Sequence, residues 1–177
     1  ITKGTPQFDI VGLGDISVQE SKQRISAALM NSGVELKQSK TIVNLSPANV
    51  RKSGSMFDFP ILAAILSANG IIPSDLSDAV FIGEVSLGGE VSAVNGVLSM
   101  VLCAKEEGIK RVFLPFKNMA EASVVGGIEV YGIKTVSELI DVLTGRKRLE
   151  PAKEYIPSPE EFTYDMDFAD VKGQENI

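Results

Sequence analysis

The side chains that most often carry out catalysis are sparse in this sequence. No histidine occurs in the 177 residues, which excludes histidine-dependent serine or cysteine catalysis and any histidine-containing zinc site within this chain. The single cysteine, Cys103, lies in the apolar stretch 101–104, so we expect it to be a small buried hydrophobic residue. The remaining candidates are carboxylates, basic residues, glycines and serines.

The acidic residues Asp15, Glu20, Asp58 and Glu84 could in principle pair for acid/base chemistry or hold a metal ion. They lie on different predicted elements, however, and no common spacing connects them. We therefore predict no metal site and no catalytic carboxylate pair. Helix caps and solvated faces are a sufficient explanation for Asp15, Glu20 and Asp58.

The glycine pair Gly12 and Gly14 precedes a predicted helix but lacks the third glycine of a dinucleotide-binding loop. The sequence also has no glycine-rich loop followed by lysine and serine or threonine, the pattern that surrounds a nucleotide phosphate. We interpret the glycine pair as a turn before a capped helix, and we predict no cofactor site in this chain.

Four basic residues, Lys37, Lys40, Arg51 and Lys52, flank one predicted strand and are the candidates for local contacts with DNA phosphates. A solvated loop is the competing interpretation of the same residues. The net charge of −6 argues against general nucleic-acid binding, because the domain as a whole repels phosphate.

Helical and strand patterns alternate along the first 145 residues. Two Ser/Thr-x-x-Glu capping boxes, at Ser17 and Thr135, predict helix starts, and an all-round apolar helix from Asp58 should lie at the centre of the core. Further helices are expected at 96–107 and 119–125, and strands at 8–11, 41–45, 79–84, 90–94, 111–114 and 128–131, with a tight hairpin turn at 88–89. This alternation predicts an α/β fold of the α+β type, with helices covering a twisted mixed sheet.

The two ends suggest a piece of a longer protein. Ile1 is not followed by a charged and apolar signal region, and no stretch reaches the roughly 20 apolar residues needed to cross a bilayer, so we expect a soluble, cytoplasmic protein. Prolines and charged residues follow Gly145. We therefore divide the chain into a compact domain (1–145), a linker (146–166) and the truncated start of another domain (167–177).

Several ordered motifs resemble a known family. The passages 54–60, 83–91, 95–97 and 108–118 resemble the C-terminal domain of Lon protease and the related domain of RadA/Sms. With 8–13, 19–21 and 43–48 added, the chain is more similar still, over nearly its whole length, to the N-terminal domain of the ComM/YifB proteins. These are competence-related, magnesium-chelatase-like AAA+ ATPases, and the resemblance implies the ribosomal-protein/Lon C-terminal fold.

That resemblance carries further expectations. Residues 167–177 resemble the entry to an AAA+ domain, which would bind ATP and magnesium beyond Ile177. The full-length protein would be a homo-oligomeric, hexameric ring acting on DNA, as a helicase or branch-migration factor in recombination or natural transformation. This domain would contact its own AAA+ domain and neighbouring subunits, without catalysis of its own, and alone would be a monomer or weak oligomer.

Lon-type peptidases use a serine nucleophile and a lysine base, and this chain keeps only half of that pair. Ser55 stands at the serine position, but Met100 stands at the lysine position, and a thioether cannot accept a proton. Lys105 lies more than one helical turn further on. We predict degenerate peptidase positions, with a Lon-type Ser/Lys peptidase and a chelatase-like chaperone as alternatives. Gly14, Ser92 and Asn95 depart from the family pattern, and the last two weaken any DNA contact by the hairpin.

Overall fold

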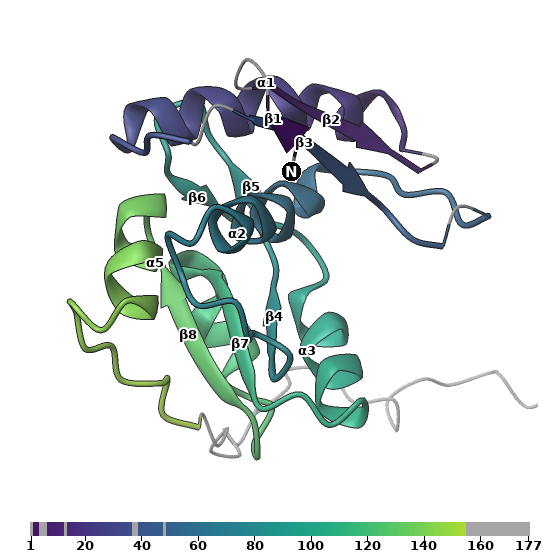
Figure 1. Ribbon diagram of the computed structural model, residues 1–177. Helices are drawn as coiled ribbons and strands as arrows, with labels where there is room; N and C mark the ends of the chain where they lie inside the picture. Colours follow the sequence, from purple (N-terminus) through teal and green to yellow (C-terminus); the bar gives the residue numbers. More distant parts are fainter. Residues whose placement is uncertain (1, 4–6, 13, 37–38, 48, 155–177) are drawn as a thin grey trace, which may run out of the picture.

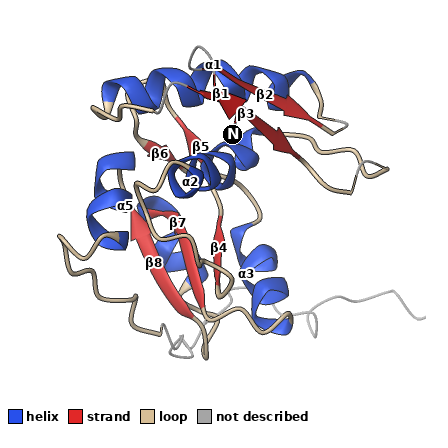
Figure 2. Ribbon diagram, viewed as in Figure 1, coloured by secondary structure: helices blue, strands red, loops and turns tan. Residues whose placement is uncertain are grey.

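The computed structural model of the chain describes residues 2–3, 7–12, 14–36, 39–47 and 49–154. Its elements in chain order are β1 (Thr2–Lys3), β2 (Gln7–Val11), α1 (Ile16–Asn31), β3 (Ser39–Asn44), η1 (Ser55–Phe57), α2 (Asp58–Ala68), β4 (Ala79–Phe81), β5 (Glu84–Val85), β6 (Val91–Ser92), α3 (Val97–Glu106), β7 (Arg111–Pro115), η2 (Phe116–Asn118), α4 (Met119–Ala122), β8 (Glu129–Ile133) and α5 (Val136–Leu143). Helix α2 lies between a sheet that carries α1 and a second sheet flanked by α3 and α5 (Figures 1 and 2). The predicted α/β fold of the α+β type is confirmed.

The first sheet has the strand order β1-β3-β2. Strands β2 and β3 are parallel and are connected through α1, whereas β1 pairs antiparallel with β3. Ile10 lies opposite Val43 in the register, and both pack against the main core. Because successive strand residues point to opposite faces, Ile42 lies on the outer face, where it is exposed.

The second sheet, β4-β7-β8, is entirely parallel and is covered on both faces. In β7, Val112 and Leu114 pack in a cluster with residues of α3 and α4, whereas Phe113 packs in the other cluster with α2 and α5. All three side chains are at most 1% exposed. A continuous apolar run is what a strand buried on both faces requires.

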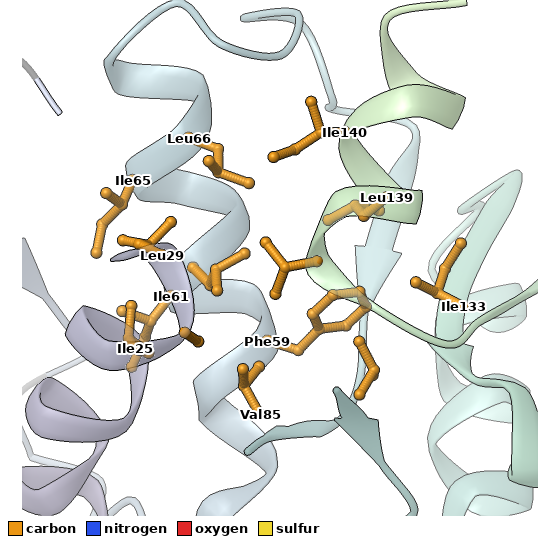
Figure 3. Close-up of a cluster of buried hydrophobic side chains, with 14 of the residues drawn as sticks. Ile25, Leu29, Phe59, Ile61, Ile65, Leu66, Val85, Ile133, Leu139 and Ile140 are labelled. Atoms are coloured by element: carbon orange, nitrogen blue, oxygen red, sulfur yellow. The ribbon is translucent and has the colours of Figure 1, made fainter. Parts of the chain in front are cut away.

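Helix α2 forms the centre of the core, as predicted. Ile25 and Leu29 of α1 pack on one side of it, and Leu139 and Ile140 of α5 pack on the other (Figure 3). Phe59 near its start is fully buried. Burying one such side chain contributes about 1.5–3 kcal/mol, so α2 connects the two sheets through hydrophobic packing.

The predicted strand 79–84 is divided in the structure. Ala79–Phe81 forms β4, the backbone N–H of Ile82 still donates to the carbonyl of Phe113 at 3.0 Å, and Gly83 then changes direction with φ of 152°. Glu84–Val85 forms β5, which pairs antiparallel with β6. The hairpin turn predicted at 88–89 is longer in the structure: it spans the residues between Val85 and Val91 and is closed by backbone hydrogen bonds between Ser86 and both Gly89 and Glu90.

Two local predictions were wrong. Asp15, and not Ser17, caps α1, because its Oδ1 accepts a 2.9 Å hydrogen bond from the backbone N–H of Val18. Cys103 is exposed and not buried, because α3 buries Val97, Val101 and Ala104 along one face and Cys103 falls outside it. The capping box at Thr135 is confirmed: its hydroxyl accepts from the backbone N–H of Glu138 at 3.1 Å.

The first part of the predicted linker packs against the domain. Leu149 contacts the main core, and Ala152 contacts the second cluster. The backbone N–H of Ala152 donates to the carbonyl of Val130 in β8 at 2.7 Å. Residues 146–154 therefore run beside the outer edge of β8 (Figure 1), while the rest of the predicted linker and residues 167–177 lie outside the described residues.

Candidate functional site

Ser55, the residue at the expected serine position, begins η1 immediately before α2. Its hydroxyl donates a hydrogen bond to the carboxylate of Glu84 at the start of β5. The preceding Gly54 has φ of 90°, and its backbone N–H donates to Oδ2 of Asp15 at 3.2 Å. Ser55 is thus held between the N-terminus of α1 and the hairpin by hydrogen bonds to acidic residues.

A buried ion pair lies next to this serine. The side chain of Asp58 is completely buried, and Arg24 of α1 donates to it through Nε (2.7 Å) and Nη2 (3.0 Å). The hydroxyl of Ser21 and the backbone N–H of Val85 also donate to the Asp58 carboxylate. A buried carboxylate requires such compensation, because an unpaired buried charge is very costly.

The surroundings of Arg24 favour its charged form. The hydrogen bond to Asp58 raises the pKa of Arg24 above its ordinary value, and the nearby Glu84 and Glu20 add to the effect. Glu20 itself is mostly exposed and lies 3.6 Å from Nη1 of Arg24. The pKa of Asp15 is lowered chiefly by the hydrogen bond from the backbone of Val18, as expected of a helix cap.

Sequence spacing did not reveal this cluster. The fold brings Asp15, Asp58 and Glu84 around Ser55, although they come from three separate elements. Caps and solvated faces were the expectation for the acidic residues: Asp15 does cap α1, whereas Asp58 is neither a cap nor solvated. The one available signal was Asp58 itself, an acidic residue at the start of an otherwise apolar helix.

The positions expected to supply a base for Ser55 lie elsewhere in the described structure. Met100 on α3 is partly buried and packs with the second hydrophobic cluster. Lys105 points toward the turn before β8, with its Nζ 3.5 Å from the position a Cβ on Gly127 would occupy. Among the residues that the structure describes, no lysine hydrogen-bonds to Ser55. The titratable group that its hydroxyl contacts is the carboxylate of Glu84.

The four candidates for DNA contact are placed differently. Arg51 is exposed and close enough to Asp15 to lower the pKa of that carboxyl further. Lys52 is buried, and its Nζ donates a hydrogen bond to the carbonyl of Pro47. Its ammonium group therefore contacts the protein backbone and is not exposed on the surface. Lys40 belongs to strand β3, and Lys37 lies outside the described residues.

The Gly12 position has a structural explanation. Its φ is 103°, and a Cβ there would approach the carbonyl oxygen of Leu45 to 2.4 Å. The backbones of β2 and the loop after β3 can come this close only at a glycine. Packing therefore accounts for Gly12 without any bound nucleotide.

The described residues contain no group of three acidic or cysteine side chains placed to hold a metal ion. Within the same part of the chain, no helix combines the length and apolarity needed to cross a bilayer.

Comparison with known families adds what the geometry alone does not give. Residues 1–118 match the family described as subunit ChlI of Mg-chelatase. The chain belongs to this magnesium-chelatase-like family. The match ends within η2, so it includes Ser55, Asp58, Glu84 and Met100.

Individual relatives extend over almost the whole chain. An uncharacterized protein of Mycobacterium tuberculosis is 39% identical over 98% of this chain. Competence protein ComM of Haemophilus influenzae is 31% identical over 99%, and YifB of Escherichia coli is 30% identical over 99%. This chelatase-like chain spans about one third of the length of these relatives (34%, 35% and 34%).

A partial similarity to Lon peptidases is also present. Lon protease 2 of Bacillus subtilis is 34% identical over 96 residues, which is 54% of this chain and 17% of that protein. The resemblance to ComM, YifB and Lon inferred from the motifs is therefore confirmed.

Proposed function

We propose that this chain is a non-catalytic domain of a longer magnesium-chelatase-like AAA+ ATPase that acts on DNA. The observation that carries the non-catalytic part is the pairing of Ser55 with Glu84, where a Lon-type peptidase would need a lysine. The relatives are about three times longer than this chain, which leaves ample length for an ATPase that binds ATP and magnesium.

In this proposal the longer protein is a helicase or branch-migration factor in recombination or natural transformation. Similarity to the competence protein ComM of Haemophilus influenzae supports this assignment. Natural transformation requires incoming single-stranded DNA to be joined to a duplex, a process that an ATP-driven ring could extend. In this proposal the protein acts in the cytoplasm.

The domain itself would form a tier of a hexameric ring, in contact with its own AAA+ domain and with neighbouring subunits. The net charge of −6 supports protein contacts over broad contact with a DNA duplex. The buried Arg24–Asp58 pair supports a structural role for the domain, because Asp58 connects α2 with α1 and, through the backbone of Val85, with the hairpin.

The two alternatives make different predictions. A Lon-type peptidase is supported by the partial similarity to Lon protease 2, but it would need another base for Ser55. A chelatase-like chaperone is supported by the family description and would act on a protein or tetrapyrrole complex without DNA.

The test uses the full-length protein with ATP and magnesium. ATP hydrolysis is measured with and without branched DNA, unwinding of the same substrate is followed by gel or fluorescence, and casein cleavage is measured in parallel. The proposal expects DNA-stimulated hydrolysis, unwinding, and no cleavage. ATP hydrolysis at the same rate with and without DNA, together with no unwinding, would contradict the proposed function and favour the chaperone alternative.

A further inference from the structure

The parallel sheet carries a row of stacked aromatic rings. Phe81, Phe113 and Tyr131 occupy the same register position on β4, β7 and β8. The ring centroids of Phe81 and Phe113 are 5.2 Å apart, and those of Phe113 and Tyr131 are 5.1 Å apart, with interplanar angles of 13° and 16°. The row follows the spacing of the strands, about 4.8 Å in a parallel sheet, so each ring presents its faces to the next strand.

The two ends of this aromatic row differ. At one end, Phe59 meets Phe81 edge-on, with centroids 5.8 Å apart and an interplanar angle of 78°, which closes the row inside the core. At the other end, Tyr131 lies on β8, the last strand of the sheet (Figure 1). Among the described residues, no further ring stacks beyond Tyr131.

A cavity of about 500 Å³ lies beside this row, and both Phe113 and Tyr131 are among its lining residues. Its other walls come from the loop after α2 and from the segment after α5, including Leu76 and Leu149. Small-molecule sites commonly have volumes of about 300–1,000 Å³. The cavity is therefore large enough for a planar ring in contact with Tyr131.

Three cationic side chains, Arg111, Lys147 and Arg148, also line this cavity. Arg111 lies 5.8 Å from the centroid of the Phe113 ring and is paired with Asp78 outside the lining, and Lys147 is paired with Glu138.

Arg148 is the cation most available to a ligand. It pairs with Glu150 at 2.8 Å, but the two side chains are 89% and 73% exposed. Exposed pairs of this kind contribute little to stability, so the Arg148 guanidinium can exchange its partner for an anionic ligand.

We propose that this cavity binds a nucleotide, with the base stacked on Tyr131 and the phosphate directed to Arg148. A ligand that contacts both the Tyr131 ring and the Arg148 guanidinium needs a planar ring and an anionic group. A nucleotide has both. The ligand is either a free mononucleotide or an exposed base of single-stranded DNA. Binding of single-stranded DNA would rest on the proposed function and specify which part of the domain contacts DNA. Binding of a free mononucleotide is independent of the proposed function.

The test uses the 177-residue chain. Binding of a fluorescein-labelled oligothymidylate is measured by anisotropy, and binding of thymidine monophosphate is measured by calorimetry, both at low salt. Tyr131→Leu removes the stacking ring, and Tyr131→Phe keeps it. Phe116→Leu is the matched control, because Phe116 is a partly exposed ring outside the cavity, with Lys134 at 4.5 Å from its centroid.

Loss of one base-stacking contact weakens binding by about 5- to 100-fold, and that is the effect expected for Tyr131→Leu. Tyr131→Phe and Phe116→Leu should stay within about twofold of the unmodified chain, since both keep the stacking face of the site. Arg148→Gln should weaken binding and flatten its salt dependence, because one phosphate contact is lost.

Tight binding of the oligonucleotide with weak binding of the monophosphate supports single-stranded DNA as the ligand. Comparable affinities support a mononucleotide. The proposal is overturned if neither probe binds, or if the Tyr131→Leu variant, shown by circular dichroism to be folded, binds as well as Tyr131→Phe. Failure of DNA unwinding by the full-length protein with retained monophosphate binding would contradict the proposed function and leave this site standing.

Discussion

Nε of Arg24 lies 2.7 Å from Oδ2 of Asp58, and the Asp58 side chain is completely buried. The pair connects α1 to the first residue of α2. The backbone N–H of Val85, in the β5–β6 hairpin, also donates a hydrogen bond to Oδ2 of Asp58 at 3.3 Å. The Asp58 carboxylate therefore connects three elements that lie close to Ser55 in the fold.

Asp58→Ala should lower the free energy of unfolding by about 3 kcal/mol, because it leaves the Arg24 guanidinium without its main partner. Urea denaturation followed by circular dichroism measures this loss. Asp141→Ala is the matched control, since Asp141 forms an exposed pair with Arg146, and its effect should be below about 1 kcal/mol. Equal effects of the two substitutions would show that the buried pair has no special role.

Thr135→Ala should destabilise the domain by about 1 kcal/mol, because the cap that accepts from the backbone N–H of Glu138 is lost. Ser137→Ala, at an exposed position in the same helix turn, serves as the control and should change stability little. Thermal unfolding of both variants provides the measurement. A Thr135→Ala variant as stable as the unmodified chain would argue against the cap.

Asp78 and Arg111 predict a specific pH dependence. The hydrogen bonds from Arg111 hold the pKa of Asp78 below its ordinary value of 3.8. A carboxyl whose pKa is lower in the folded state contributes stability above its ordinary pKa, and this contribution is lost as the pH falls through the folded-state value. Asp78→Asn should therefore destabilise the chain at pH 7.

The difference between Asp78→Asn and the unmodified chain should shrink as the pH falls below about 3.8, where the carboxyl of the unfolded chain becomes protonated. Urea midpoints measured at several pH values test this. In an Arg111→Gln background the effect of Asp78→Asn should be much smaller at every pH. A pH-independent difference would mean that the ion pair is not its cause.

Much of the fold could be predicted from local patterns. The apolar run of α2, the alternation of helices and strands, and the Thr135 cap all depend on residues close in sequence, where periodicity and capping chemistry are informative. The division of strand 79–84 was missed because it occurs at Gly83, where φ is 152° and an added Cβ would come within 3.2 Å of Pro115 and Val91, a crowding that local patterns do not reveal. Cys103 was misplaced because apolar neighbours do not reveal which face of a helix is buried.

The candidate site was less accessible to sequence reasoning. Motif order placed Ser55 and Met100 at the degenerate peptidase positions, but no spacing could show that Glu84 accepts a hydrogen bond from Ser55 or that Arg24 neutralises Asp58. These contacts join residues 29 and 34 positions apart. The burial of Lys52 depends likewise on the path of the loop that contains Pro47.

The central claim, that this domain supports a DNA-acting ATPase without peptidase chemistry of its own, is tested most directly at Ser55 in the full-length protein. Ser55→Ala is compared with the unmodified protein and with Ser53→Ala, an exposed serine in the same loop. Each is assayed for unwinding of branched DNA, casein cleavage and labelling by a fluorophosphonate. We predict ATP-dependent unwinding at similar rates in all three proteins, with no cleavage and no label on Ser55. Casein cleavage or labelling that is present in the unmodified protein and in Ser53→Ala but lost in Ser55→Ala would contradict the account.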